Sequence, residues 1–146
     1  MIKLADNAKI KLILKQTADG NTDSSELFTR GEFREHGGSF FIDYDESEAT
    51  GYAGSHVQLR IGQQDDTVTM TRTGKAFSSL VFENGKRHFC QYGTEYGDCM
   101  IGISTVAMRN AMTSGGGELY VRYTIDVNAG LMLENEITIN VKPHND

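Results

Sequence analysis

Several features that would narrow the class of this 146-residue protein are scarce in its sequence. Its two cysteines, Cys90 and Cys99, are too few for the disulfide framework of a small secreted domain. The single proline, Pro143, lies near the C-terminus, where it interrupts no strand. No apolar run approaches the ~20 residues of a membrane-spanning helix, and the first residues lack the apolar core of a signal peptide. We therefore expect a cytoplasmic protein that makes no membrane contact.

Positive charge is also scarce, because 14 Lys and Arg residues stand against 20 Asp and Glu residues and leave a net charge of −6. Such a chain repels phosphate backbones, which makes nucleic acid a poor candidate partner. The nearest approach to a basic stripe is Lys9, Lys11 and Lys15, which we interpret as a solvated strand face or as protection of a sheet edge. No glycine-rich phosphate loop opens a helix, so nucleotide binding has no support.

Short segments that alternate apolar and polar residues are abundant, and the clearest runs from Glu118 to Val127. A period of two is typical of a strand with one face on a core and one in water. Similar segments recur from Lys9 to Val141 with turn residues between them. The pattern predicts one all-β domain over residues 1–146, an antiparallel sandwich or closed barrel of about eight to ten strands. Closure into a barrel would remove the exposed edges of so long a meander.

Apolar residues must face one another across each hairpin, and this requirement fixes the expected register. A two-residue turn at Gly37-Gly38 places Phe33 opposite Ile42. Strands at 56–62 and 67–73 align their apolar faces in the same way. These alignments predict which side chains lie inside the barrel.

The remaining connections are predicted from turn chemistry and polarity. The polar stretch 18–25 is expected to link the first two strands as a loop. Asn84-Gly85 predicts a type I′ turn, which needs positive φ at both central residues. A three-residue loop at 128–130 aligns the apolar faces of the last two strands. Segment 104–117 fits either a strand end or one helical turn.

Several segments together resemble a known family. They read TMTRTG at 69–74, LVFENGKRH at 80–88, YGTEYG at 92–97, and GEL at 117–119 followed by YTID at 123–126. Over about residues 10–141 this pattern resembles the YwiB-like family of uncharacterised bacterial lipocalin-like (calycin) β-barrel proteins. The resemblance implies a single antiparallel lipocalin-like barrel in a bacterial cytoplasm. The family has no assigned activity, so the resemblance carries over no catalytic residue.

Five polar residues share the inward parity of their strands and form the candidate ligand-binding site: Arg72, Tyr44, Tyr123, Asn135 and Tyr92. The planar guanidinium of Arg72 suits the carboxylate of a ligand; the alternative is that Arg72 lies at a strand end and has a structural role in packing or capping. Buried polar groups must form hydrogen bonds, so Tyr123 and Asn135 belong either to a satisfied core network or to a ligand site.

Leu80, Phe82 and Phe89 are expected on the outer face, opposite in parity to Val81 and Cys90. An exterior apolar cluster implies cover by a second copy in a homodimer or by another segment of the chain.

Catalytic and metal chemistry find little support in the sequence. Asp43, Asp45, Glu46 and Glu48 are spaced like calcium ligands, but Glu48 stands where such a loop needs glycine. No nucleophile is evidently paired with a base, so we expect neither an enzyme nor a cofactor. The leading hypothesis is a barrel that binds a small, partly apolar ligand in its interior. The alternative is a structural or protein-interaction module that acts through the exterior apolar cluster.

Overall fold

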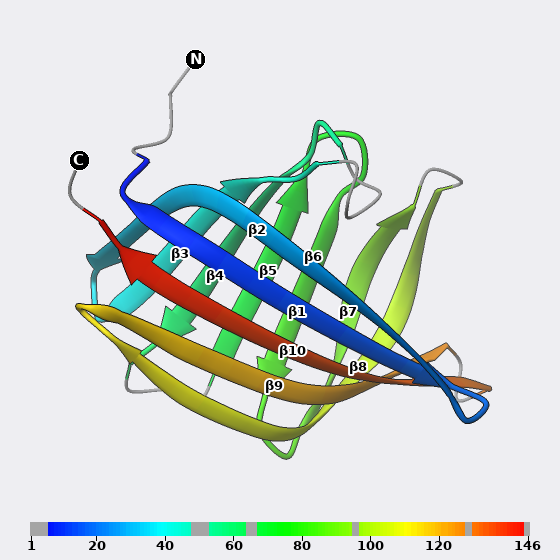
Figure 1. Ribbon diagram of the computed structural model, residues 1–146. Coiled ribbons are helices and arrows are strands. Elements are labelled where there is room, and N and C mark those ends of the chain that lie inside the picture. Colours follow the sequence, from blue (N-terminus) through cyan, green and yellow to red (C-terminus); the bar gives the residue numbers. More distant parts are fainter. Residues whose placement is uncertain (1–5, 48–52, 64–66, 95–96, 128–129, 145–146) are drawn as a thin grey trace.

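The computed structural model describes residues 6–47, 53–63, 67–94, 97–127 and 130–144 (Figure 1). These residues form ten strands: β1 (Ala8–Ala18), β2 (Asn21–His36), β3 (Ser39–Asp45), β4 (His56–Gly62), β5 (Thr67–Thr73), β6 (Ser78–Glu83), β7 (Arg87–Thr94), β8 (Gly97–Thr113), β9 (Gly116–Val127) and β10 (Leu131–Pro143). Strands adjacent in sequence pair antiparallel, and β1 pairs with β10 to close the barrel. The predicted all-β closed barrel is thus confirmed. Within the described part of the chain, no helix is long and apolar enough to cross a membrane.

The barrel interior is filled by the apolar face of each alternating strand. Its largest fully buried apolar side chains are Phe82, Ile10, Ile42, Leu59, Ile61, Ile103, Leu119, Ile139, Val57, Val68 and Val121. Burial of each large apolar side chain contributes about 1.5–3 kcal/mol. Phe33 and Phe40 stack with their ring centroids 5.6 Å apart. This packed core holds the strands in register.

Most of the predicted alignments are confirmed. Phe33 lies opposite Ile42, and Leu59 lies opposite Met70 in the register between β4 and β5. Gly37 and Gly38 both have positive φ, 59° and 78°, as a type I′ turn requires. β9 and β10 pair in the register expected for a three-residue loop, of which residues 128–129 lie outside the described residues.

The polar stretch 18–25 is not a loop, and this prediction was wrong. Asp19 and Gly20 form a tight turn with φ values of 50° and 78°, and Ala18 pairs directly with Asn21. The polar residues therefore belong to β2. Figure 1 shows why they lack alternation, since the β1–β2 hairpin (blue) reaches past the barrel wall beside the β9–β10 hairpin. Residues 21–26 are all exposed, so neither face of this segment needs apolar side chains.

The β6–β7 hairpin also departs from expectation. Lys86 donates its backbone N–H to the Glu83 carbonyl at 3.0 Å, but positive φ occurs at Gly85 and not at Asn84, so the turn is not type I′. A regular ladder from Glu83 and Lys86 would place Ser78 opposite Gln91, yet Ser78 pairs with Tyr92.

The Val81 N–H bonds instead to Cys90 Sγ at 3.3 Å, and the ladder slips by one residue. A slip of one residue reverses the faces of a strand.

Segment 104–117 consists of the end of β8, a turn at 114–115 and the start of β9, and it contains no helical turn. β8 extends through it to Thr113 and pairs with β9 along this length. A β-bulge between Thr105 and Ala107 takes up one extra residue and leaves Val106 exposed.

Candidate functional site

A cavity of about 200 Å³ lies inside the barrel, near the mouth at which β3, β5, β7 and β9 end and β10 begins. All five predicted ligand-binding residues line it: Tyr44, Arg72, Tyr92, Tyr123 and Asn135. Its remaining wall is largely aliphatic and comes from β1, β2, β5, β6, β9 and β10. Strand parity therefore correctly placed these five residues, which are far apart in the sequence, around one cavity.

Arg72 points inward as predicted, but its charge is already paired. Its Nε donates to Glu46 Oε1 at 2.8 Å. The Arg72 side chain is 15% exposed and that of Glu46 only 1% exposed. Because each ion lacks much of its hydration, the two charges depend on one another.

Three tyrosines line the cavity together with this ion pair. Burial, and then the nearby Glu46 carboxylate, raises the pKa of Tyr44 far above its ordinary value. Burial likewise raises the pKa of Tyr123, with a further contribution from Tyr92. Tyr44 and Tyr123 therefore stay protonated near neutral pH and offer hydroxyl groups to the interior. The Tyr123 ring also packs against Phe82, with the centroids 4.7 Å apart.

Asn135 is the polar residue whose hydrogen bonding is incomplete. It lies opposite Tyr123 as predicted and is 2% exposed. Its Oδ1 accepts a hydrogen bond from Gln16 Nε2 at 3.0 Å. Its Nδ2, however, has no hydrogen-bond partner among the described residues. A buried amide donor that lines a cavity is available to an acceptor atom of a bound molecule.

Four polar residues that line the cavity are absent from the predicted site: Gln16, Ser25, Glu26 and Glu46. Gln16 and Glu46 could be found by extending strand parity, because Gln16 follows Ile10, Leu12 and Leu14 at intervals of two. Glu46 follows Ile42 and Tyr44 in the same way, although β3 itself ends at Asp45.

The predicted exterior apolar cluster does not exist as such. Leu80 and Phe82 are 6% and 1% exposed and lie in the barrel core, because the slip in the β6–β7 ladder turns their strand face inward. The expectation that they form an interface was therefore wrong. Phe89 is 68% exposed as predicted, and the Arg87 guanidinium stacks on its ring at 4.4 Å.

The acidic residues near the end of β3 serve internal contacts. His56 Nε2 lies 2.9 Å from Asp43 Oδ1, and His56 Nδ1 lies 3.0 Å from Asp45 Oδ1. Glu46 holds Arg72, and Glu48 lies outside the described residues. Within the ranges that the structure describes, no group of three or more His, Cys, Asp or Glu residues is placed to hold a metal ion.

Comparison with known proteins identifies the family. A family model described as a domain of unknown function (DUF1934) matches residues 10–139. The crystal structure of the ywiB protein from Bacillus subtilis is similar over 96% of this chain and 93% of that chain, with a TM-score of 0.83 and 16% identity. No curated protein matches the chain. Because the family model covers most of the sequence, this protein belongs to the YwiB-like DUF1934 family.

Proposed function

We propose that the barrel is a non-catalytic binding protein for a small, neutral, partly apolar molecule that carries a hydrogen-bond acceptor. The observation that carries this proposal is the unpaired Asn135 Nδ2 group beside a cavity of about 200 Å³. At roughly 30 Å³ per molecule, this space is equivalent to about seven waters, which is more than a packing defect. A cytoplasmic location remains part of the proposal and is supported by the free thiols of Cys90 and Cys99.

The charge balance of the cavity favours a neutral ligand over a carboxylate. Arg72 is the cation among the lining residues, and Glu46 already neutralises it at 2.8 Å. A second acidic residue, Glu26, also lines the cavity. An anionic ligand would have to compete with a carboxylate that is held inside the barrel. A carbonyl oxygen on an otherwise apolar molecule meets no such competition, because it would accept from Asn135 and pack against aliphatic side chains.

An NMR titration with two small ring compounds, followed on the ligand signals and on the protein amide resonances, tests the proposal. Cyclohexanone and methylcyclohexane have similar shapes, but only the ketone has an acceptor oxygen. We expect Asn135→Leu to weaken cyclohexanone binding by roughly ten-fold, because the ketone oxygen would be buried without a donor, which costs about 1–3 kcal/mol. Binding of methylcyclohexane, which accepts no hydrogen bond, should not weaken in the same variant.

Two results would overturn the proposal. One is an equal effect of Asn135→Leu on the affinities for the two compounds. The other is the absence of changes in amide resonances at cavity residues when cyclohexanone is near saturation. If the proposal holds, native mass spectrometry of protein purified gently from its host should identify a co-purified ligand of the expected neutral class.

A further inference from the structure

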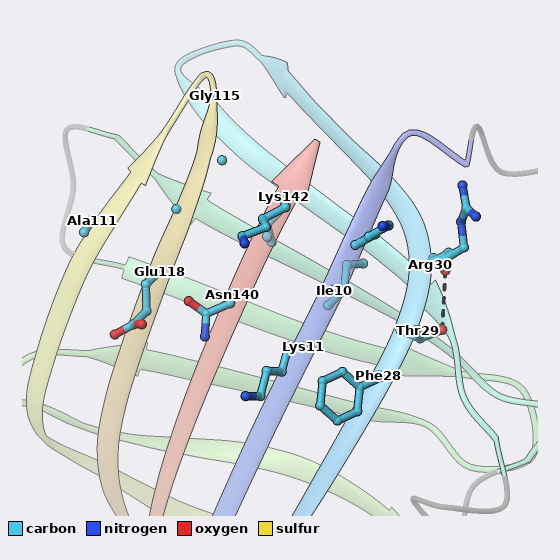
Figure 2. A pocket seen from close by; sticks show the side chains of 14 residues that line it. Ile10, Lys11, Phe28, Thr29, Arg30, Ala111, Gly115, Glu118, Asn140 and Lys142 are labelled. Atoms are coloured by element: carbon cyan, nitrogen blue, oxygen red, sulfur yellow. Dashed lines mark hydrogen bonds between the residues drawn. The ribbon is translucent and has the colours of Figure 1, made fainter. Parts of the chain in front are cut away.

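A second concave site lies on the outer surface of the barrel, near the end that holds both described chain ends. It is a groove of about 1010 Å³ over the outer face of β1, β2, β8, β9 and β10. Figure 2 shows Lys11, Phe28, Glu118 and Asn140 projecting into it from neighbouring strands. The internal cavity and this groove share no lining residue.

Cations are concentrated in one cross-strand row of the groove. Lys9 on β1 lies directly opposite Arg30 on β2 and directly opposite Lys142 on β10. Side chains opposite one another in an antiparallel sheet have Cβ atoms about 4.5–5.5 Å apart, and like charges at such positions are destabilising. Folding alone therefore gives no reason to place three cations side by side in a chain of net charge −6.

Protection of a sheet edge does not account for these lysines either. Lysine blunts strands whose backbone groups are unpaired. β1 is paired on both sides, with β2 and with β10, in a closed barrel. Its lysines therefore lie in the interior of the sheet.

Two of the three cations lack a neutralising partner. Arg30 is held by Asp6 at 3.0 Å and contacts the His144 ring at 2.9 Å. In the described ranges, neither Lys9 nor Lys142 forms an ion pair. Both ammonium groups line the groove and are consequently available to the negative charges of a bound molecule.

An exposed aromatic ring flanks this row. Phe28 is 69% exposed, and Lys11 Nζ lies 5.4 Å from its ring centroid. A large apolar ring beside unpaired cations provides a surface for a planar group that is attached to an anion. Anion and planar group would thus be bound side by side in the one groove.

We propose that this groove binds a small molecule with adjacent phosphate groups and a planar apolar part, the chemistry of a nucleoside diphosphate. The phosphates would lie between Lys9 and Lys142, and the planar part would pack against Phe28. The groove is close to the upper end of the ~300–1,000 Å³ range of small-molecule sites. A longer polyanion is disfavoured, because Glu118 lines the groove and the chain as a whole carries a net charge of −6.

Isothermal titration calorimetry at low ionic strength tests this proposal with adenosine diphosphate and inorganic pyrophosphate. The double variant Lys9→Gln/Lys142→Gln should weaken binding of both compounds by about ten-fold or more, since two charge-assisted contacts are lost. Phe28→Ser should weaken binding of adenosine diphosphate but not of pyrophosphate. Added salt should weaken both.

The matched control is Lys15→Gln/Lys75→Gln, which makes the same change in net charge at exposed lysines outside the groove. This control should retain binding, and both double variants should keep the circular dichroism spectrum of the natural protein. The Lys9/Lys142 variant should also still bind cyclohexanone in the interior, which separates this test from that of the proposed function.

Three results would overturn the assignment. The first is the absence of adenosine diphosphate binding at ~1 mM, a concentration that detects even weak specific sites. The second is an equal loss of binding in the control. The third is binding of a single-stranded oligonucleotide that is far tighter than binding of adenosine diphosphate and is lost in the Lys9/Lys142 variant.

Discussion

Removal of the Arg72 guanidinium should destabilise the barrel, because it would leave the Glu46 carboxylate buried without its counter-ion. Removing one partner of a buried ion pair costs about 3–5 kcal/mol. Arg72 is 15% exposed, against 1% for Glu46, so some hydration already reaches the pair. We therefore expect Arg72→Met to cost about 3 kcal/mol, at the lower end of that range. For a chain of this size, such a loss lowers Tm by roughly 6–12 °C.

Equilibrium urea unfolding, followed by circular dichroism, measures this loss directly. Because an apolar pair of similar volume often replaces a buried ion pair without cost, Arg72→Met/Glu46→Met should regain most of the stability. Arg34→Met is the control, since it breaks the more exposed Arg34–Glu32 pair. This control should cost no more than about 1 kcal/mol. A double variant no more stable than Arg72→Met, or an equal loss in the control, would refute the reasoning.

The corrected strand register and the His56 contacts lead to two further predictions. Phe82→Ala should cost about 3–5 kcal/mol as a core truncation. Phe89→Ala at the exposed position should change stability by only about 0.5 kcal/mol. Similar losses for the two in urea unfolding would contradict the inward placement of Phe82. Partial burial opposes the charge on His56, but its bonds to Asp43 and Asp45 outweigh this effect and raise its pKa above 6.5. The stability that these two contacts add to the folded protein is complete below pH 6.5 and is lost as the pH rises through the folded-state pKa of His56. Thermal melts should therefore show stability falling above pH 6.5, and His56→Gln should remove this component; an unchanged profile would argue against it.

Strand parity predicted the interior of β5 but failed for β6, and the reason is physical. In β5, Val68 and Met70 alternate with threonines, so the face of Arg72 is unambiguous. In β6, Leu80, Val81 and Phe82 are consecutive apolar residues, and alternation cannot orient them. Their direction then depended on the assumed Asn84-Gly85 turn. The hydrogen bond from Val81 to the Cys90 sulfur, which offsets the ladder, has no sequence signature.

The polar stretch 18–25 failed for a different reason. The Asp19-Gly20 pair is a strong hairpin signal in the sequence itself. Polarity argued against strands on either side of it, because a half-buried strand needs an apolar face. That requirement lapses where a hairpin extends beyond the barrel, and the extent of this projection depends on how the long strands are staggered. Stagger is a property of the assembled sheet, so no local pattern reveals it.

The polarity of the cavity follows from how inward positions change along each strand. They pass from aliphatic or aromatic to polar toward one mouth: Phe40, Ile42 and Tyr44 in β3; Val68, Met70 and Arg72 in β5; and, read backwards, Val141, Ile139, Ile137 and Asn135 in β10. In an antiparallel barrel, odd-numbered strands end where even-numbered strands begin, so these polar residues converge although the chain separates them. The other end keeps an apolar core that stabilises the fold. Because binding groups and most of the buried apolar packing occupy different ends, the cavity can carry an unpaired amide such as that of Asn135 at a cost that the rest of the core offsets.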